Sequence, residues 1–268
     1  LNPPGTATPM RPRPFLLLIA GFALALMAAG EADAIEPEWS YQTEDDVSSV
    51  AISADGEYIA VGSGDDKVYL FKKDNSTPLW SYDTGSYVPS VAISADGEYI
   101  ATGSQDGKIY LFDKDSDDPL WSYDTGGYVH SVAISADGEY IVAGDGYNDV
   151  QLFDKDTGTQ LWNYTAGSGV YSVAISADGE YIVAGSQDYK VYLFGKDNST
   201  PLWNYTTGGN VNSVAISADG EYIAAGSYDD KVYLFDKDSS TPLWSYTTED
   251  QVWMVAISAD GEYIAAGS

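Results

Sequence analysis

The nine residues VAISADGEY at positions 50–58 recur five more times along this chain of 268 residues. The copies are spaced 41 residues apart and begin at Val50, Val91, Val132, Val173, Val214 and Val255. A tryptophan recurs in step with them, at Trp39, Trp80, Trp121, Trp162, Trp203 and Trp244. Self-similarity at a fixed period of this length indicates a repeat protein. We therefore expect one small structural unit, copied along the chain.

Each unit contains four short segments typical of β-strands. In the second unit these are residues 88–94 (VPSVAIS), 98–103 (EYIATG), 108–113 (KIYLFD) and 119–123 (PLWSY). Ala95-Asp96-Gly97 separates the first two as a turn in which glycine can adopt a positive φ. The third segment has aliphatic residues on one face and aromatic residues on the other, which is typical of a strand buried on both sides.

Four strands in a unit of about 40–45 residues predict an all-β fold, the β-propeller, in which each unit is one blade. A solenoid of hairpins is the competing architecture. With strands named a to d from the central channel outward, the chain supplies five full blades and a partial sixth that lacks strands c and d. We expect residues 39–42 to supply the missing d strand and close the ring, because closure removes an exposed sheet edge. The absent sixth c strand leads us to expect that the chain is part of a longer one.

Two families resemble these repeats. Residues 213–238 (SVAISADGEYIAAGSYDDKVYLFDKD) resemble a WD-repeat blade, and residues 153–164 (FDKDTGTQLWNY) resemble the quinoprotein, or pyrroloquinoline quinone, propeller repeat. Both resemblances imply a β-propeller. The WD-repeat tryptophan is replaced by phenylalanine, as at Phe112, and the Gly-His pair that opens that repeat is missing. The family's Asp-His-Ser-Trp tetrad therefore cannot form, and we expect packing and ladder bonds to hold the blades.

The first 34 residues are expected to be a leader, followed by a propeller domain at residues 35–268. Arg11 and Arg13 precede an apolar run from Phe15 to Gly30, and the small residues around Ala34 follow. This order is typical of a cleaved signal peptide and predicts a secreted or cell-surface protein. An uncleaved anchor is the alternative. The chain contains no cysteine, which excludes a disulfide framework and thiolate metal sites.

The chain is strongly acidic, with a formal net charge of −29. Both arginines lie in the leader, so the repeats carry only lysines as cations. Such a surface repels phosphate backbones, which argues against nucleic-acid binding and against binding to anionic lipid. We expect no insertion into a membrane beyond the leader.

Residues suited to catalysis are scarce. His130 is the single histidine, so no second histidine is available as a base or a zinc ligand. The uniform blades lack the unique central residues that a quinone-dependent oxidoreductase would need, and we expect neither enzymatic activity nor a cofactor. The spacing of Asp113, Asp115 and Asp117 would suit Ca²⁺, but a solvated hairpin turn is the simpler interpretation, and we predict no metal site.

The copies differ mainly in two loops. The d–a and b–c loops of a blade lie on one face of a propeller, here called the variable face, and the a–b and c–d loops lie on the other, here called the constant face. The differences gather on the variable face, whereas the a–b turn is always Ala-Asp-Gly. Relaxed constraint on loops is one explanation, and a recognition surface is the other. The candidate binding residues are Tyr87, Gln105, Tyr128, His130, Tyr171, Gln187, Asn212, Tyr228 and Trp253.

These side chains are aromatic or carry amides, which suits a protein, peptide or glycan partner. The sequence therefore predicts a non-enzymatic, exported binding or scaffold propeller that acts through its variable face. A quinone-dependent oxidoreductase-like propeller and a structural component of the cell surface are the alternatives.

Overall fold

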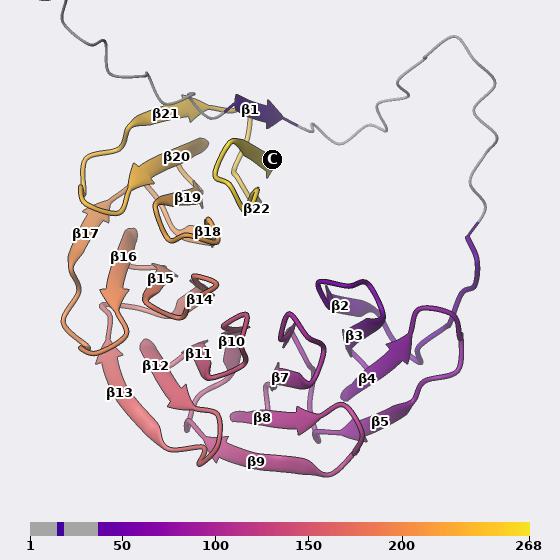
Figure 1. The fold of residues 1–268 in the computed structure, drawn as a ribbon. Coiled ribbons are helices and arrows are strands. Elements are labelled where there is room, and N and C mark those ends of the chain that lie inside the picture. The colour runs from indigo at the N-terminus through magenta and orange to yellow at the C-terminus, as the bar shows by residue number, and fades with distance from the viewer. Residues whose placement is uncertain (1–14, 19–36) are drawn as a thin grey trace, which may run out of the picture.

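The computed structural model describes residues 15–18 and 37–268, and these residues contain strands and no helix. Five antiparallel sheets of four strands follow one another along the chain, and part of a sixth completes the arrangement. Figure 1 shows them as blades around a centre, with the first strand of each blade innermost and the fourth outermost. The predicted β-propeller with five full blades and a partial sixth is confirmed.

Each full blade has strands a to d in chain order. Blade 1 consists of β2 (Val47–Ile52), β3 (Tyr58–Ser63), β4 (Lys67–Lys72) and β5 (Trp80–Asp83). Blade 2 consists of β6 (Ser90–Ile93), β7 (Tyr99–Gly103), β8 (Lys108–Asp113) and β9 (Pro119–Asp124). Blade 3 consists of β10 (Val129–Ile134), β11 (Tyr140–Asp145), β12 (Asp149–Asp154) and β13 (Gln160–Thr165). Blade 4 consists of β14 (Val170–Ile175), β15 (Tyr181–Ser186), β16 (Lys190–Gly195) and β17 (Trp203–Thr206). Blade 5 consists of β18 (Val211–Ile216), β19 (Tyr222–Ser227), β20 (Lys231–Asp236) and β21 (Trp244–Thr247).

The predicted strands of blade 2 agree with the structure to within two residues at each end, and the largest difference is that β6 begins at Ser90 and not at Val88. Pro89 has no backbone N–H to donate to the sheet, which explains the later start. The corresponding strand of blade 3, which has His130 in place of the proline, begins at Val129.

The partial sixth blade contains β22 (Met254–Ile257), β23 (Tyr263–Gly267) and β1 (Phe15–Leu18). β22 and β23 pair antiparallel, as strands a and b do elsewhere. The backbone of β1 pairs with β23 in parallel, with Phe15 opposite Tyr263, whereas strand c of every full blade is antiparallel to strand b. The rest of the expected leader lies outside the described residues, so its identity as a signal peptide stays a prediction. No helix in the described part of the chain is long and apolar enough to span a membrane.

The predicted ring closure by residues 39–42 is wrong. These residues form no strand, and no sheet pairing among the described residues joins blade 1 to the sixth blade (Figure 1). Trp39 instead stacks on Phe71 of blade 1, with 5.5 Å between ring centroids, and its indole N–H donates to the carbonyl of Lys73. Trp39 thus makes the contact that Trp80, Trp121, Trp162 and Trp203 each make with the blade that follows. The edge partner that a closing d strand would need is an antiparallel c strand, and in the described part of the chain the strand next to β23 is the parallel β1.

The hydrophobic core is divided among the interfaces between successive blades. The core between blades 3 and 4, for example, joins Val150 and Leu152 of β12 to Val170 and Val173 of β14 and to Phe194 of β16. Strand c takes part in two such cores, because its side chains alternate toward the preceding and the following blade. Its four central residues are buried in each full blade, as the two-sided pattern predicted.

Side-chain hydrogen bonds also join the blades, which the sequence interpretation missed when it assigned cohesion to packing and ladder bonds alone. The hydroxyl of Ser131 accepts from the amide of Val173 at 3.1 Å. The indole N–H of Trp121 donates to the carbonyl of Lys155 at 2.6 Å. Both bonds recur at the other junctions between full blades. Each copied serine and tryptophan therefore fixes one blade against the next.

The constant a–b turn is a joint between blades. The amide of Ala95 donates to the carbonyl of Ala136 in the next blade at 2.9 Å, and similar bonds link the other a–b turns. Gly97 has a φ of +75°, and a Cβ placed on it would lie 2.7 Å from the ring of Tyr58 in the preceding blade. Both the conformation and the close approach require glycine here. The uniformity of Ala-Asp-Gly therefore has a structural cause.

We predict that Gly97→Ala destabilises the protein more than Gly56→Ala does. Both residues have a left-handed φ, which costs an alanine about 1–2 kcal/mol. Only Gly97 faces a preceding blade, because nothing lies within 4 Å of a Cβ on Gly56. The clash with Tyr58 should therefore add about 1–3 kcal/mol to the loss caused by Gly97→Ala. Guanidinium unfolding of both variants measures the difference, and equal losses would show that the turn is not a tight joint.

Candidate functional site

The most variable position of the repeat lies at a β-bulge. Between β10 and β11 the register steps from Val129 to Ser131, so His130 is left without a partner residue. Register shifts at the same place leave out Ser48, Tyr171 and Asn212 in blades 1, 4 and 5. A bulge removes its residue from the ladder and redirects the side chain. These four strands therefore need not conserve this side chain, and the fold directs it toward the variable face.

Five of the nine predicted binding residues line one pocket of about 350 Å³, here called the rim pocket. They come from blades 3 to 6 and are His130, Tyr171, Asn212, Tyr228 and Trp253. Two aromatic pairs form its walls. His130 meets Tyr171 edge to face with centroids 4.9 Å apart, and Tyr228 meets Trp253 in the same way at 5.0 Å.

The rim pocket combines exposed aromatic rings with two polar side chains, Asn212 and His130, whose hydrogen bonding or charge is set by the surrounding protein. Trp253 is 60% exposed and Tyr171 is 36% exposed, so both offer ring surface to a ligand. The side-chain amide of Asn212 donates to the carbonyl of Val252 at 3.1 Å, which leaves its oxygen free to accept from a ligand. Burial lowers the pKa of His130 below its ordinary value, so the imidazole is neutral at pH 7. The pocket can therefore bind apolar and hydrogen-bonding groups together.

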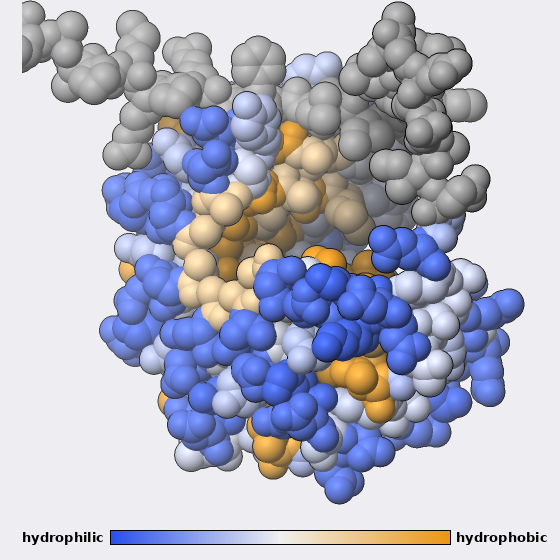
Figure 2. All heavy atoms as spheres, turned by 45° about the vertical axis from the view of Figure 1, so that its right-hand side comes forward, coloured by the Kyte–Doolittle hydropathy of each residue, from blue (hydrophilic) through white to orange (hydrophobic). Residues whose placement is uncertain are grey.

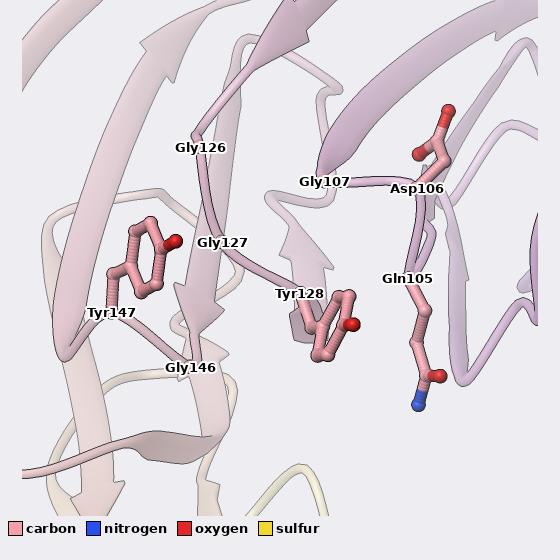
Figure 3. Close-up of a pocket in the computed structure, with 8 residues that line it drawn as sticks. All are labelled: Gln105, Asp106, Gly107, Gly126, Gly127, Tyr128, Gly146 and Tyr147. Carbon is pink, nitrogen blue, oxygen red and sulfur yellow. The ribbon is translucent and has the colours of Figure 1, made fainter.

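A second pocket of about 410 Å³ lies where the b–c loops of blades 2 and 3 meet, and we call it the tyrosine pocket. Figure 3 shows the Tyr128 ring and Gln105 on one side of the Gly126–Gly127 backbone and Tyr147 on the other. Its lining residues are Gln105, Asp106, Gly107, Gly126, Gly127, Tyr128, Gly146 and Tyr147. It thus contains the predicted residues Gln105 and Tyr128.

Tyr87 and Gln187 are the predicted residues that line neither pocket. The carbonyl of Tyr87 accepts from the amide of Gln105, and the amide of Gln187 donates to the carbonyl of Gly169. These bonds are backbone contacts between the d–a and b–c loops of one blade. Both residues therefore lie on the variable face, but outside the two pockets.

Tyr147 is the main site residue that the sequence interpretation missed. It occupies a position that is aspartate in the other full blades, at Asp65, Asp106, Asp188 and Asp229. In blade 2 that aspartate is structural, because the Tyr110 hydroxyl donates to it at 2.5 Å. Burial, followed by this carboxylate, raises the pKa of Tyr110. A position that is the same in four of the five full blades looks invariant, and the single exception in blade 3 was the clue to this site residue.

Repeated ion pairs lie on the constant face. On the constant face, lysines of the c–d turns pair with glutamates beside the a–b turns, as Lys114 does with Glu98 at 3.0 Å. Four further pairs of this kind join Lys73 to Glu57, Lys155 to Glu139, Lys196 to Glu180 and Lys237 to Glu221. Half of the ten lysines in the repeats are engaged there. Carboxylates nevertheless outnumber lysines on both faces.

The centre of the molecule is apolar. An open cavity of about 320 Å³ is lined by alanine, valine and isoleucine side chains of the a strands, among them Ala92, Ala133 and Ala174. Figure 2 shows apolar side chains gathered in a hollow that hydrophilic side chains surround. Within the described residues, no three acidic or histidine side chains are grouped to hold a metal ion. In the c–d turn proposed as a calcium alternative, Asp113 accepts the amide of Asp115 at 2.9 Å.

We predict that His130 titrates below pH 6.5 and that Tyr171→Ala raises its midpoint toward that value. The burial that lowers its pKa depends in part on the Tyr171 ring. For a histidine whose folded pKa lies below the unfolded one, stability is unaffected above pH 6.5 and falls as the pH drops below it. Because this histidine is the only one in the chain, its NMR titration needs no assignment. A midpoint at or above 6.5 in the unaltered protein would contradict the buried geometry.

Comparison with known protein families agrees with this architecture. Residues 36–72, which include the first three strands of blade 1, match the model of the WD domain, G-beta repeat. Residues 88–267 match the family model described as outer membrane protein assembly factor BamB. No curated protein gives a significant match to the chain. Since the second model spans more than half of the sequence and most of the propeller, the chain belongs to the family of propeller repeats described as outer membrane protein assembly factor BamB.

Proposed function

We propose that this protein is a non-enzymatic binding propeller that holds an extended segment of a partner protein against its variable face. Both family matches support a protein-binding or scaffold role in general terms. The observation that carries the specific proposal is the rim pocket, in which four blades direct aromatic and amide side chains into one space.

The geometry of the rim pocket suits a segment of polypeptide. Buried aromatic contacts supply much of the affinity of protein interfaces, often more than 1 kcal/mol for each ring. The oxygen of Asn212 can accept a backbone N–H, and the exposed rings of Tyr171 and Trp253 can cover an apolar side chain. A propeller presents these groups without rearrangement because the strands that carry them are fixed by the cores between blades. Preorganisation of this kind lowers the cost of binding.

The absence of catalysis is part of the proposal. The single histidine is half-buried and its pKa is lowered by burial, and the copied acids of the turns accept hydrogen bonds from neighbouring amides. The rival function, a quinone-dependent oxidoreductase, would be supported by a quinone absorbance band after reconstitution with the cofactor and calcium. We expect no such band.

We further propose that the protein acts outside the cytoplasm. The order of charged, apolar and small residues in the first 34 positions supports export, and the family description names an outer-membrane assembly factor. Expression of the whole sequence in an exporting bacterial host should yield a mature protein that begins at Ile35. Amino-terminal sequencing measures this, and a mature chain that retains Met10 would support a membrane anchor instead.

The double variant Tyr171→Ala with Trp253→Ala should weaken binding about 10- to 100-fold, because two aromatic anchors are lost and each tenfold corresponds to about 1.4 kcal/mol. The probe is a set of 12-residue peptides selected from a random display library against the unaltered protein, with affinities measured by calorimetry. Both side chains are substantially exposed, so the melting temperature should change little.

The matched control is the double variant Glu98→Gln with Glu139→Gln on the constant face. These glutamates make only exposed ion pairs with Lys114 and Lys155, so the variant should fold and bind as the unaltered protein does. Binding that survives loss of the rings but is lost with the glutamates would place the partner on the constant face.

A further inference from the structure

Blade 3 departs from the other full blades at four neighbouring positions, which lie at the end of β11, in the b–c loop and in β12. Asp145 stands where they have serine, Tyr147 where they have aspartate, Asp149 where they have lysine and Gln151 where they have tyrosine. No other blade changes any of these four positions. In a chain whose copies are otherwise so uniform, four linked changes in one blade need a common cause.

The first part of that cause is a rebuilt hydrogen-bond network. Asp145 is fully buried, and its carboxylate accepts from the amides of Tyr147 and Asp149 and from the side chain of Gln151, each at 2.9 Å. Gln151 in turn accepts from the side chain of Gln160 at 2.8 Å. The buried carboxylate takes over the bonding that the turn aspartate provides in other blades. Position 147 is thereby released from its structural role.

The released position carries a tyrosine that faces solvent. Tyr147 is 66% exposed and Tyr128 is 62% exposed, and both line the tyrosine pocket (Figure 3). The Tyr147 ring lies against Gly127, where an added Cβ would be 2.9 Å from the ring. Large exposed aromatic surfaces are unfavourable in water unless a ligand covers them.

The walls of the tyrosine pocket carry negative charge. Asp106 lines it, and Asp124 lies beside it and accepts the amide of Gly126 at 2.9 Å. Asp149 replaces the lysine of other blades next to this turn and accepts from the hydroxyl of Thr165. None of the residues that line the pocket is a cation. Aromatic faces surrounded by carboxylates attract a cation and repel an anion.

We propose that the tyrosine pocket binds an arginine or lysine side chain of the partner's segment. This inference rests on the proposed function, because it takes the ligand to be a segment of a protein. The positive charge of the bound side chain is inferred from the tyrosine pocket itself. Gly146 lies between the two pockets: it lines the tyrosine pocket, its amide donates to the carbonyl of Tyr128, and a Cβ at its position would lie 3.2 Å from the ring nitrogen of His130 in the rim pocket. An extended segment anchored in the rim pocket would therefore pass over Gly146 and place its basic residue in the tyrosine pocket.

Titration with Nα-acetyl-arginine amide tests the tyrosine pocket separately from the rim pocket, because the molecule is small enough to occupy one pocket alone. In the protein labelled with ¹³C in its tyrosine rings, we expect the NMR signals of Tyr128 and Tyr147 to shift. The neutral analogue Nα-acetyl-citrulline amide has nearly the same shape without the charge, and it should bind at least about fivefold more weakly. Added salt should weaken arginine binding, because exposed charges are screened.

Tyr147→Asn should weaken binding of the arginine probe about two- to fivefold, since one cation–π contact of an exposed ring is lost. Tyr189→Asn is the matched control, because Tyr189 is an exposed tyrosine of the b–c loop in blade 4 that lies outside both pockets. Its φ is +73°, a conformation that asparagine tolerates better, so this variant should fold and bind arginine unchanged. Thermal melts of both variants check that each remains folded.

Three results would overturn the proposal: arginine that leaves both rings unshifted, citrulline that binds as tightly as arginine, or equal losses in the two variants. Ring shifts caused by methyl glucoside but not by arginine would assign the pocket to a glycan instead. The proposed function is tested separately, by whether binding of the selected peptides is weakened when Tyr171 and Trp253 are replaced.

Discussion

The packing of each blade against the next is the constraint on which the rest of this structure depends. Strand c has buried side chains on both faces, so a blade cannot be stable alone and gains its core only at its two junctions. Polar contacts then set the angle of each junction. A serine in strand a accepts an amide of the next blade, and a tryptophan in strand d reaches a carbonyl there. Because each junction uses the same positions, those positions are the same in every copy.

This constraint explains where the copies are free to differ. The residue at the β-bulge takes no part in the ladder, and its neighbours Val129 and Ser131 carry the core contact and the bond between blades. The a–b turns are exposed but are tied to each other through Ala95 and Ala136, which removes their freedom. The contrast between variable and constant faces is therefore structural in origin. The argument for recognition rests on the convergence of the varied side chains in the rim pocket.

Much of the fold could be predicted from the repeat, because 41 residues with four turn signals allow few arrangements. Strand limits agreed within two residues in blade 2, where Pro89 shortens β6 for a reason visible in its chemistry. Ring closure was predicted wrongly, since a closing strand at residues 39–42 needs a c strand to pair with, and the absence of that strand was already visible in the sequence. Because all a strands surround one centre, the sequence predicted that the candidate residues would converge, and five of them do so in the rim pocket. The sequence did not show which candidates would line a pocket, and Tyr87 and Gln187 line neither of the two. Tyr147 was missed because the comparison of the copies singled out positions that differ in many blades, whereas this position differs in only one.

Blade 3 shows how a repeat protein can change one unit without losing the fold. A buried carboxylate is costly unless donors surround it, and Asp145 has three of them within its own blade. At least two of the four substitutions depend on another member of the set. Asp145 without Gln151 would lack a donor, and Tyr147 without Asp145 would leave the turn amides without their carboxylate. The set is therefore best explained as a unit, and its visible outcome is an exposed tyrosine beside Gly146 in the tyrosine pocket. The core between blades 2 and 3 loses the strand-c tyrosine that packs in the other junctions, but the serine and tryptophan bonds of that junction are kept. Blade 3 thus gives up one buried ring and gains an exposed one on the variable face, an exchange that we attribute to binding.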